Sequence, residues 1–176
     1  MEEKKLWEKC VGFHGHECGG LAIGFKAALY ARELLGLGRA EDEEVVCIAE
    51  CDACPIDAIQ VILGCTAGKG NLLFHITGKF AFSFYERRSG RAVRLMMTAY
   101  DDGLDRRQSM EFYLSHEPRE IFTVTDVKLP LPEKARMMDS RRCDACGERT
   151  AEEHLHLSGG RLLCRDCYQE YDRFNV

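Results

Sequence analysis

Four cysteines near the C-terminal end constrain the fold of this chain more than any other feature. Cys143 and Cys146 form one CxxC pair, Cys164 and Cys167 form a second, and 17 residues separate the pairs. In each pair a short turn directs two thiolates to the same side, so two pairs complete the four-coordinate tetrahedron that zinc prefers. The spacing therefore predicts a structural zinc site. The alternatives are two disulfides or four free thiols.

The residues between and after these pairs predict a small finger. Residues 153–157 alternate like a strand, Ser158-Gly159-Gly160 is typical of a turn, and residues 161–163 return as a second strand. We expect a helix from Cys164 to Phe174 to close the module. A knuckle, a hairpin and a helix that carries the last two ligands are typical of a treble-clef zinc finger.

A proline-containing segment separates the finger from the rest of the chain. Pro130 and Pro132 are the only close pair of prolines, and the charged stretch that follows them cannot continue a strand. We predict a core domain over residues 1–129, a linker over 130–140 and a four-cysteine finger over 141–176. A domain of about 130 residues can bury its own core, whereas a finger of about 35 residues depends on its metal.

Composition narrows the compartment and the partners. The chain has ten cysteines but no apolar signal-peptide core in its first nine residues and no apolar run long enough to span a membrane. We therefore expect a reducing cytoplasm, where thiols serve metal binding or catalysis. Net charge is −5, and residues 141–176 carry six basic against seven acidic side chains, which disfavours nucleic acid as a partner.

Helices and strands alternate irregularly in the core domain. Periodicity and turn residues predict helices over 20–35, 55–63 and 105–115, and strands over 44–49, 72–77, 80–85, 92–97 and 121–128. Because there is no regular βαβ repeat, the expected class is α+β, a mixed helix and antiparallel-sheet core.

One candidate site segment places two imidazoles and a thiol within five residues. His14, His16 and Cys18 stand among glycines just before the helix expected from about Gly20. The unpaired amides and the dipole of that helix favour an anion, so Cys18 is a candidate thiolate. The alternative is a glycine-rich turn whose polar groups only cap the helix.

A second candidate segment lies at the start of the next helix. Pro55 suits the first helical position, which makes Cys54 the N-cap residue. If the two helix starts meet, they form an open metal site from His16, Cys18 and Cys54, with His14 and Asp57 as hydrogen-bonding supports or general base. The identity of this second metal stays open. The alternative is a simple cap in which Asp57 faces the free amides.

The remaining cysteines of the core domain have less to offer a metal. Cys10 and Cys47 stand in apolar patterns and are expected in the core. Cys65 follows Cys54 by 11 residues across a helix, roughly 15 Å at the helical rise, which is too far to share one metal. Cys51-x-x-Cys54-Pro is part of a ferredoxin pattern, but the other closely spaced cysteines are missing.

Three stretches of the core domain resemble the FmdE family, which takes its name from a component of formylmethanofuran dehydrogenase, in versions that carry a C-terminal zinc finger. The resemblance covers most of residues 1–129 and rests on residues 13–24, 54–60 and 64–72. One departure is Gly19, where the family usually has proline. The resemblance implies an α+β core, a homodimer and a cleft lined by the histidines and cysteines of the first two stretches. It also implies a link to one-carbon metabolism with molybdenum or tungsten enzymes, and hence an oxidoreductase partner.

Two classes of function remain open at this point. A catalytic core site would carry out metal-assisted or thiolate chemistry on a small one-carbon or carbonyl substrate. A non-enzymatic accessory, metal-delivery or regulatory subunit of a molybdenum or tungsten oxidoreductase is the alternative. A third interpretation, a finger that reads nucleic acid, conflicts with the acidic balance of the finger.

Overall fold

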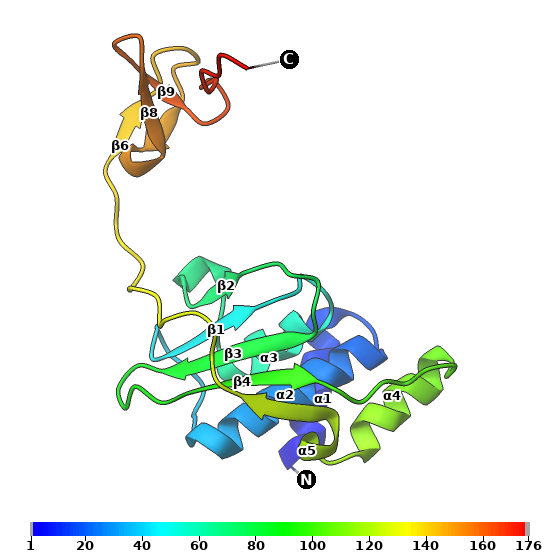
Figure 1. Cartoon of the computed structure of the whole chain (residues 1–176). Coiled ribbons are helices and arrows are strands. Elements are labelled where there is room, and N and C mark those ends of the chain that lie inside the picture. Colours follow the sequence, from blue (N-terminus) through cyan, green and yellow to red (C-terminus); the bar gives the residue numbers. More distant parts are fainter. Residues whose placement is uncertain (1, 175–176) are drawn as a thin grey trace. The chain divides into compact units, whose positions relative to one another are not determined.

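The computed structural model describes residues 2–174 and divides into two compact units, Met1–Ala135 and Arg136–Val176 (Figure 1). The first unit is built, in chain order, from α1 (Glu2–His14), α2 (Gly19–Leu35), β1 (Val45–Ala49), α3 (Pro55–Leu63), the 3-10 helix η1 (Ala67–Lys69), β2 (Leu72–Phe74), β3 (Ala81–Glu86), β4 (Ala92–Met97), α4 (Arg106–Ser115), α5 (Pro118–Ile121) and β5 (Phe122–Thr125). This mixture confirms the expected α+β class.

One five-stranded sheet forms the centre of the first unit. Its order is β2-β1-β3-β4-β5, and every neighbouring pair is antiparallel except β1 with β2, which are parallel. The parallel pair arises because α3 connects β1 to β2 as a crossover, a βα unit that the irregular alternation of the sequence did not predict. All five residues of β1 are buried, as expected for a central strand.

Helices α1, α2 and α3 cover one face of this sheet and enclose the main core (Figure 1). Helix α2 is central, because ten of its residues are buried and it packs against α3 and α4. Gly24 allows the closest approach, since a Cβ at this position would lie 2.5 Å from Cα and 2.6 Å from the carbonyl carbon of Pro55. The start of α3 is thereby held directly against α2.

The opposite face of the sheet is covered by the chain that leaves β5. Val127 and Leu129 pack against a small cluster on β1 and β3, and Tyr85 donates a hydrogen bond to the carbonyl of Leu129 at 2.7 Å. Farther along, Arg87 donates to the carbonyl of Pro132, and Glu43 accepts from the backbone N–H of Ala135. The first unit therefore holds the chain as far as Ala135.

The second unit contains two short hairpins around the four cysteines. It is built from β6 (Ser140–Arg142), β7 (Arg149–Ala151), the 3-10 helix η2 (Glu152–His154), β8 (Leu155–Ser158) and β9 (Arg161–Cys164). The strands pair as β6 with β7 and β8 with β9. The second pair agrees with the hairpin expected around Ser158-Gly159-Gly160.

The closing helix expected from Cys164 to Phe174 is not present. Cys164 accepts from the backbone N–H groups of Cys167 and Tyr168, but this single turn does not continue, and residues 168–172 are irregular. The prediction was wrong because these residues are mostly exposed and offer no apolar face, and a helix of about ten residues is marginal without packing. The treble-clef assignment loses its helical part.

Candidate metal sites

The first site begins where α1 ends. His14 is the last residue of α1, and Gly15 follows it with φ of +91°, a left-handed conformation that suits glycine. The N–H of Gly15 donates to the carbonyl of Val11 at 2.8 Å, which closes the helix. The chain then reverses, so that His16 returns beside His14 with their ring centroids 4.5 Å apart.

The start of α2 adds a thiol to these two imidazoles. Cys18 is the N-cap residue of α2, and its Sγ accepts a hydrogen bond from the N–H of Leu21 at 3.3 Å. The same Sγ lies 3.7 Å from Nε2 of His14. One donor atom from each of His14, His16 and Cys18 lies within 4.8 Å of the others. Cys18 therefore caps the helix and also belongs to a compact group of three metal-ligand side chains.

Helix α3 supports this group with a carboxylate. His14 Nδ1 donates to Oδ2 of Asp57 at 2.7 Å, and Gln60 Nε2 donates to Oδ1 of the same carboxylate at 3.1 Å. The proton on Nδ1 leaves Nε2 of a neutral imidazole with a free lone pair, directed at Cys18. A carboxylate that holds the far nitrogen of a histidine in this way is typical of metal-binding histidines.

Cys54 borders the group without belonging to the mutual 4.8 Å set. Its position is fixed by the close packing of the two helix starts, since a Cβ on Gly20 would lie 2.9 Å from Cβ and 3.5 Å from Sγ of Cys54. Desolvation, followed by the charge of Cys18 and a hydrogen bond with it, raises the pKa of the Cys54 thiol. Cys54 makes no side-chain capping bond to α3, and Asp57 bonds to His14 and Gln60 instead of the free amides.

The distance between the two best-placed donors fits a tetrahedral metal. With metal–nitrogen and metal–sulfur bonds of about 2.05 and 2.3 Å, a tetrahedral angle separates nitrogen from sulfur by about 3.6 Å. His14 Nε2 and Cys18 Sγ are 3.7 Å apart. The residues present therefore suit a borderline-soft divalent cation such as zinc.

An open depression of about 510 Å³ lies beside these groups and gives a small molecule access to them. His14, Cys54, Asp57, Gln60 and Phe74 are among its lining residues. It lies past the carboxyl ends of the parallel strands β1 and β2, where α/β sheets commonly bind ligands. The two helix starts and these strand ends thus share one solvent-accessible edge.

The structure places the five core candidates at this edge and assigns His14 a different position from the one expected. Its Nε2 faces the thiol directly, whereas the sequence suggested His14 as a support for His16, Cys18 and Cys54. Gln60 was missed. Its spacing of three residues from Asp57 on one helix was the available signal, because i and i+3 side chains share a face.

The other cysteines of the first unit lie away from the site. Cys10, Cys47 and Cys65 are buried, and Cys65 donates to the carbonyl of Val45 at 3.5 Å. Burial raises the pKa of Cys10 to about 11 and that of Cys65 to about 12. These three thiols are small core residues, as the apolar patterns predicted for Cys10 and Cys47.

The four finger cysteines form the second candidate site. Their Sγ atoms all lie within 4.8 Å of one another, and Sγ of Cys146 is 3.8 Å from that of Cys164. Zinc–sulfur bonds of about 2.3 Å give a tetrahedral edge of about 3.8 Å, so the sulfurs match a four-thiolate zinc site. Backbone N–H donors, led by that of Cys146 and then that of Cys164, lower the pKa of Cys143 to about 6. All ten cysteines of the chain are free thiols, so the finger has no disulfide.

Comparison with known proteins places the first unit in a family. The family model described as "FmdE, Molybdenum formylmethanofuran dehydrogenase operon" matches residues 13–125, which include every core site residue discussed above. The chain belongs to the FmdE family. This agrees with the resemblance carried by residues 13–24, 54–60 and 64–72.

Two relatives give this FmdE-family chain a structural and a curated comparison. The crystal structure of an FmdE-like protein of the tungsten formylmethanofuran dehydrogenase type, from Syntrophus aciditrophicus, matches with a TM-score of 0.65 and 25% identity, covering 94% of this chain and 91% of that one. A probable S-adenosyl-L-methionine-binding protein from Archaeoglobus fulgidus is 27% identical over 82% of this chain and 48% of its own length. The chain thus spans about half the length of that curated relative.

No helix among residues 2–174 combines the length and the apolar character that crossing a membrane requires.

Proposed function

We propose that the chain is a metal-binding protein with one structural and one open site. In the finger, Cys143, Cys146, Cys164 and Cys167 would hold zinc and keep the hairpins folded. In the core, His14 Nε2, His16 and Cys18 would hold a second divalent metal whose open position faces the depression. A metal in such a site polarises a bound carbonyl or activates a bound water.

The observation that supports the core site most strongly is the line from Asp57 through His14 to Cys18. Asp57 fixes the orientation and the tautomer of His14 at 2.7 Å, and the free Nε2 lies 3.7 Å from the sulfur. This pre-organises two ligands from two separate helices. Cys54 adjoins Cys18 on the same edge and is suited to take the fourth position when no external ligand holds it.

The same line of groups supports a second candidate, a thiolate nucleophile. Cys18, His14 and Asp57 stand in the order of nucleophile, base and orienting carboxylate. In this role His14 would accept the Cys18 proton at Nε2, and the N–H of Leu21 would stabilise the resulting thiolate. No metal would be needed for that step.

We further propose a cytoplasmic setting in one-carbon oxidoreductase metabolism. The family is named for an operon of a molybdenum formylmethanofuran dehydrogenase, and this supports an oxidoreductase partner. An accessory role in metal delivery and an enzymatic role both fit the open site. A homodimer, as the family resemblance implies, is part of this proposal. S-adenosylmethionine binding is not carried over, because the relative with that name is about twice as long as this chain.

Replacing Asp57 with asparagine should weaken metal binding at the core site by about 10- to 100-fold, because the histidine loses its orienting carboxylate. Cobalt(II) titration of the full chain measures this, since absorption bands separate a four-sulfur site from one with nitrogen ligands. The matched control is Asp52→Asn, because Asp52 lines the same depression while the His14 ring is held by Asp57. Equal cobalt affinity in Asp57→Asn and the wild type would contradict the supporting role of Asp57.

Alkylation of Cys18 separates the metal site from the metal-free nucleophile. Iodoacetamide labelling, followed by mass spectrometry, should slow by at least tenfold when zinc is added to metal-stripped protein, because a metal-bound thiolate is shielded. Unchanged labelling at saturating zinc would contradict Cys18 as a ligand and favour the nucleophile. Purified turnover that requires Cys18 and no partner protein would then identify an enzyme rather than an accessory subunit.

A further inference from the structure

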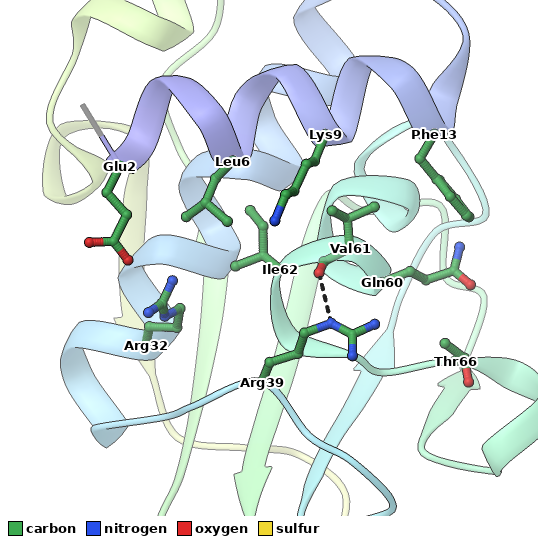
Figure 2. A pocket seen from close by; sticks show the side chains of 10 residues that line it. All are labelled: Glu2, Leu6, Lys9, Phe13, Arg32, Arg39, Gln60, Val61, Ile62 and Thr66. Atoms are coloured by element: carbon green, nitrogen blue, oxygen red, sulfur yellow. Dashed lines mark hydrogen bonds between the residues drawn. The ribbon is translucent and has the colours of Figure 1, made fainter.

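A groove of about 560 Å³ runs beside α1, away from the metal ligands (Figure 2). Its walls come from α1, from the C-terminal half of α3 and from the chain that follows α2. Figure 2 shows Glu2 and Arg32 toward one end and Phe13, Gln60 and Thr66 toward the other, with Lys9 and Arg39 between them. Its volume lies within the range typical of small-molecule sites.

Basic side chains dominate the polar lining of this groove. Lys9, Arg32 and Arg39 line it against the single carboxylate of Glu2, in a chain whose net charge is −5. Among residues 2–174, the structure gives the side chains of Lys9 and Arg32 no hydrogen bond and no ion pair. Arg39 uses its Nε to donate to the carbonyl of Val61 at 3.3 Å, which orients its terminal nitrogens toward the groove. Three cations from three separate segments thus converge without an acidic partner for each.

The rest of the lining is apolar. Leu6, Val61 and Ile62 form part of the wall, and Phe13 contributes an aromatic ring that is 59% exposed. An exposed ring beside unpaired cations suits a ligand that has both an apolar body and an anionic group. Water or a simple inorganic anion alone would leave this apolar surface uncovered.

The groove adjoins the core metal site through one residue. Gln60 lines both the groove and the depression beside His14, and it donates to Asp57 at 3.1 Å. Phe13 immediately precedes His14 in α1. A ligand in the groove therefore ends close to the Asp57–His14 pair.

We propose that this groove binds a small organic anion, with carboxylate or phosphate groups at Arg32, Arg39 and Lys9 and an apolar body against Phe13 and Ile62. Charge-assisted hydrogen bonds from arginine suit both anions. The binding does not depend on a metal in the core site, so failure of the metal proposal leaves it standing.

Two matched probes test this site in the full chain. 1-Naphthoate and 1-naphthyl phosphate carry the two anions on the same apolar body, and 1-naphthol lacks the anion. In an NMR titration of ¹⁵N-labelled, metal-stripped and metal-loaded protein, at least one anionic probe should shift the amides around Lys9, Arg39 and Gln60. It should bind at least tenfold more tightly than 1-naphthol, and the tighter of the two anions indicates the class of natural ligand.

Arg32→Gln should weaken that binding by about three- to tenfold, the effect of losing one partly solvated charged contact. The Arg32 side chain bonds to no other group among residues 2–174, so the variant should retain the wild-type spectrum. Lys5→Gln is the matched control, because Lys5 is an exposed cation of α1 outside the groove, and its affinity should change less than twofold. The proposal is overturned if neither anion shifts these amides, if 1-naphthol binds as tightly, or if both variants weaken binding equally.

Discussion

Replacing Cys143 with serine is expected to release the finger zinc and unfold residues 136–176 while residues 1–135 stay folded. The second unit contains only short strands and few buried side chains, so its stability depends on the metal. Structural zinc in small fingers provides on the order of 10 kcal/mol or more of apparent folding free energy. Cys143 is also the most deeply bonded of the four, because its sulfur accepts from the N–H groups of Ala145 and Cys164.

Elemental analysis and an ¹⁵N NMR spectrum of the purified variant measure both parts of this expectation. One zinc per chain should be lost, and the amide signals of residues 140–167 should collapse to random-coil positions. Cys65→Ser serves as the control, because a serine there keeps a donor for the carbonyl of Val45 and should leave the zinc content unchanged. A Cys143→Ser variant with full zinc content and a dispersed finger spectrum would show that the four cysteines do not hold a structural metal.

Gly24→Ala is expected to destabilise the first unit by about 3 kcal/mol or more. A methyl group at this position would collide with backbone atoms of Pro55, at 2.5 Å from its Cα, and a backbone cannot move aside as a side chain can. The two helices would have to separate. That movement would carry Cys54 and Asp57 away from Cys18 and His14, so metal affinity at the core site should fall as well.

Urea unfolding followed by the fluorescence of Trp7 measures this loss. Trp7 is the only tryptophan, and its ring packs against Phe25 of α2 with centroids 5.4 Å apart, so it reports on the first unit. Gly12→Ala is the matched control. No atom lies within 4 Å of a Cβ at Gly12, which is in α1, so alanine should stabilise the unit by up to about 1 kcal/mol. Equal stability of the Gly24→Ala variant and the wild type would contradict the tight contact between α2 and α3.

Local signals made some elements predictable to the residue. Helix α3 occupies Pro55–Leu63 as expected, because a proline at the first position and Gly64 in a left-handed cap mark both ends. The group of His14, His16 and Cys18 was also visible, since its members stand within five residues. The helix expected after Cys164 failed for the opposite reason. Its residues have turn geometry at the cysteines but no apolar face to hold a helix against the finger.

Long-range pairing could not be predicted in the same way. The bond between His14 and Asp57 joins residues 43 positions apart and depends on how α1 and α3 pack. The sequence indicated that the starts of α2 and α3 would have to meet, but only the contact at Gly24 and Pro55 shows how they do so. The exchange of roles between His14 and Cys54 follows from the same packing, because it directs Nε2 of His14 at the thiol.

Anomalous diffraction from crystals grown with zinc, recorded on both sides of the zinc absorption edge, tests the core site most directly. We predict two peaks per chain. One should lie at the centre of the four finger sulfurs, and the other about 2.0 to 2.3 Å from His14 Nε2 and Cys18 Sγ. A single peak in the finger, or a second peak away from both atoms, would contradict metal binding by this edge of the sheet.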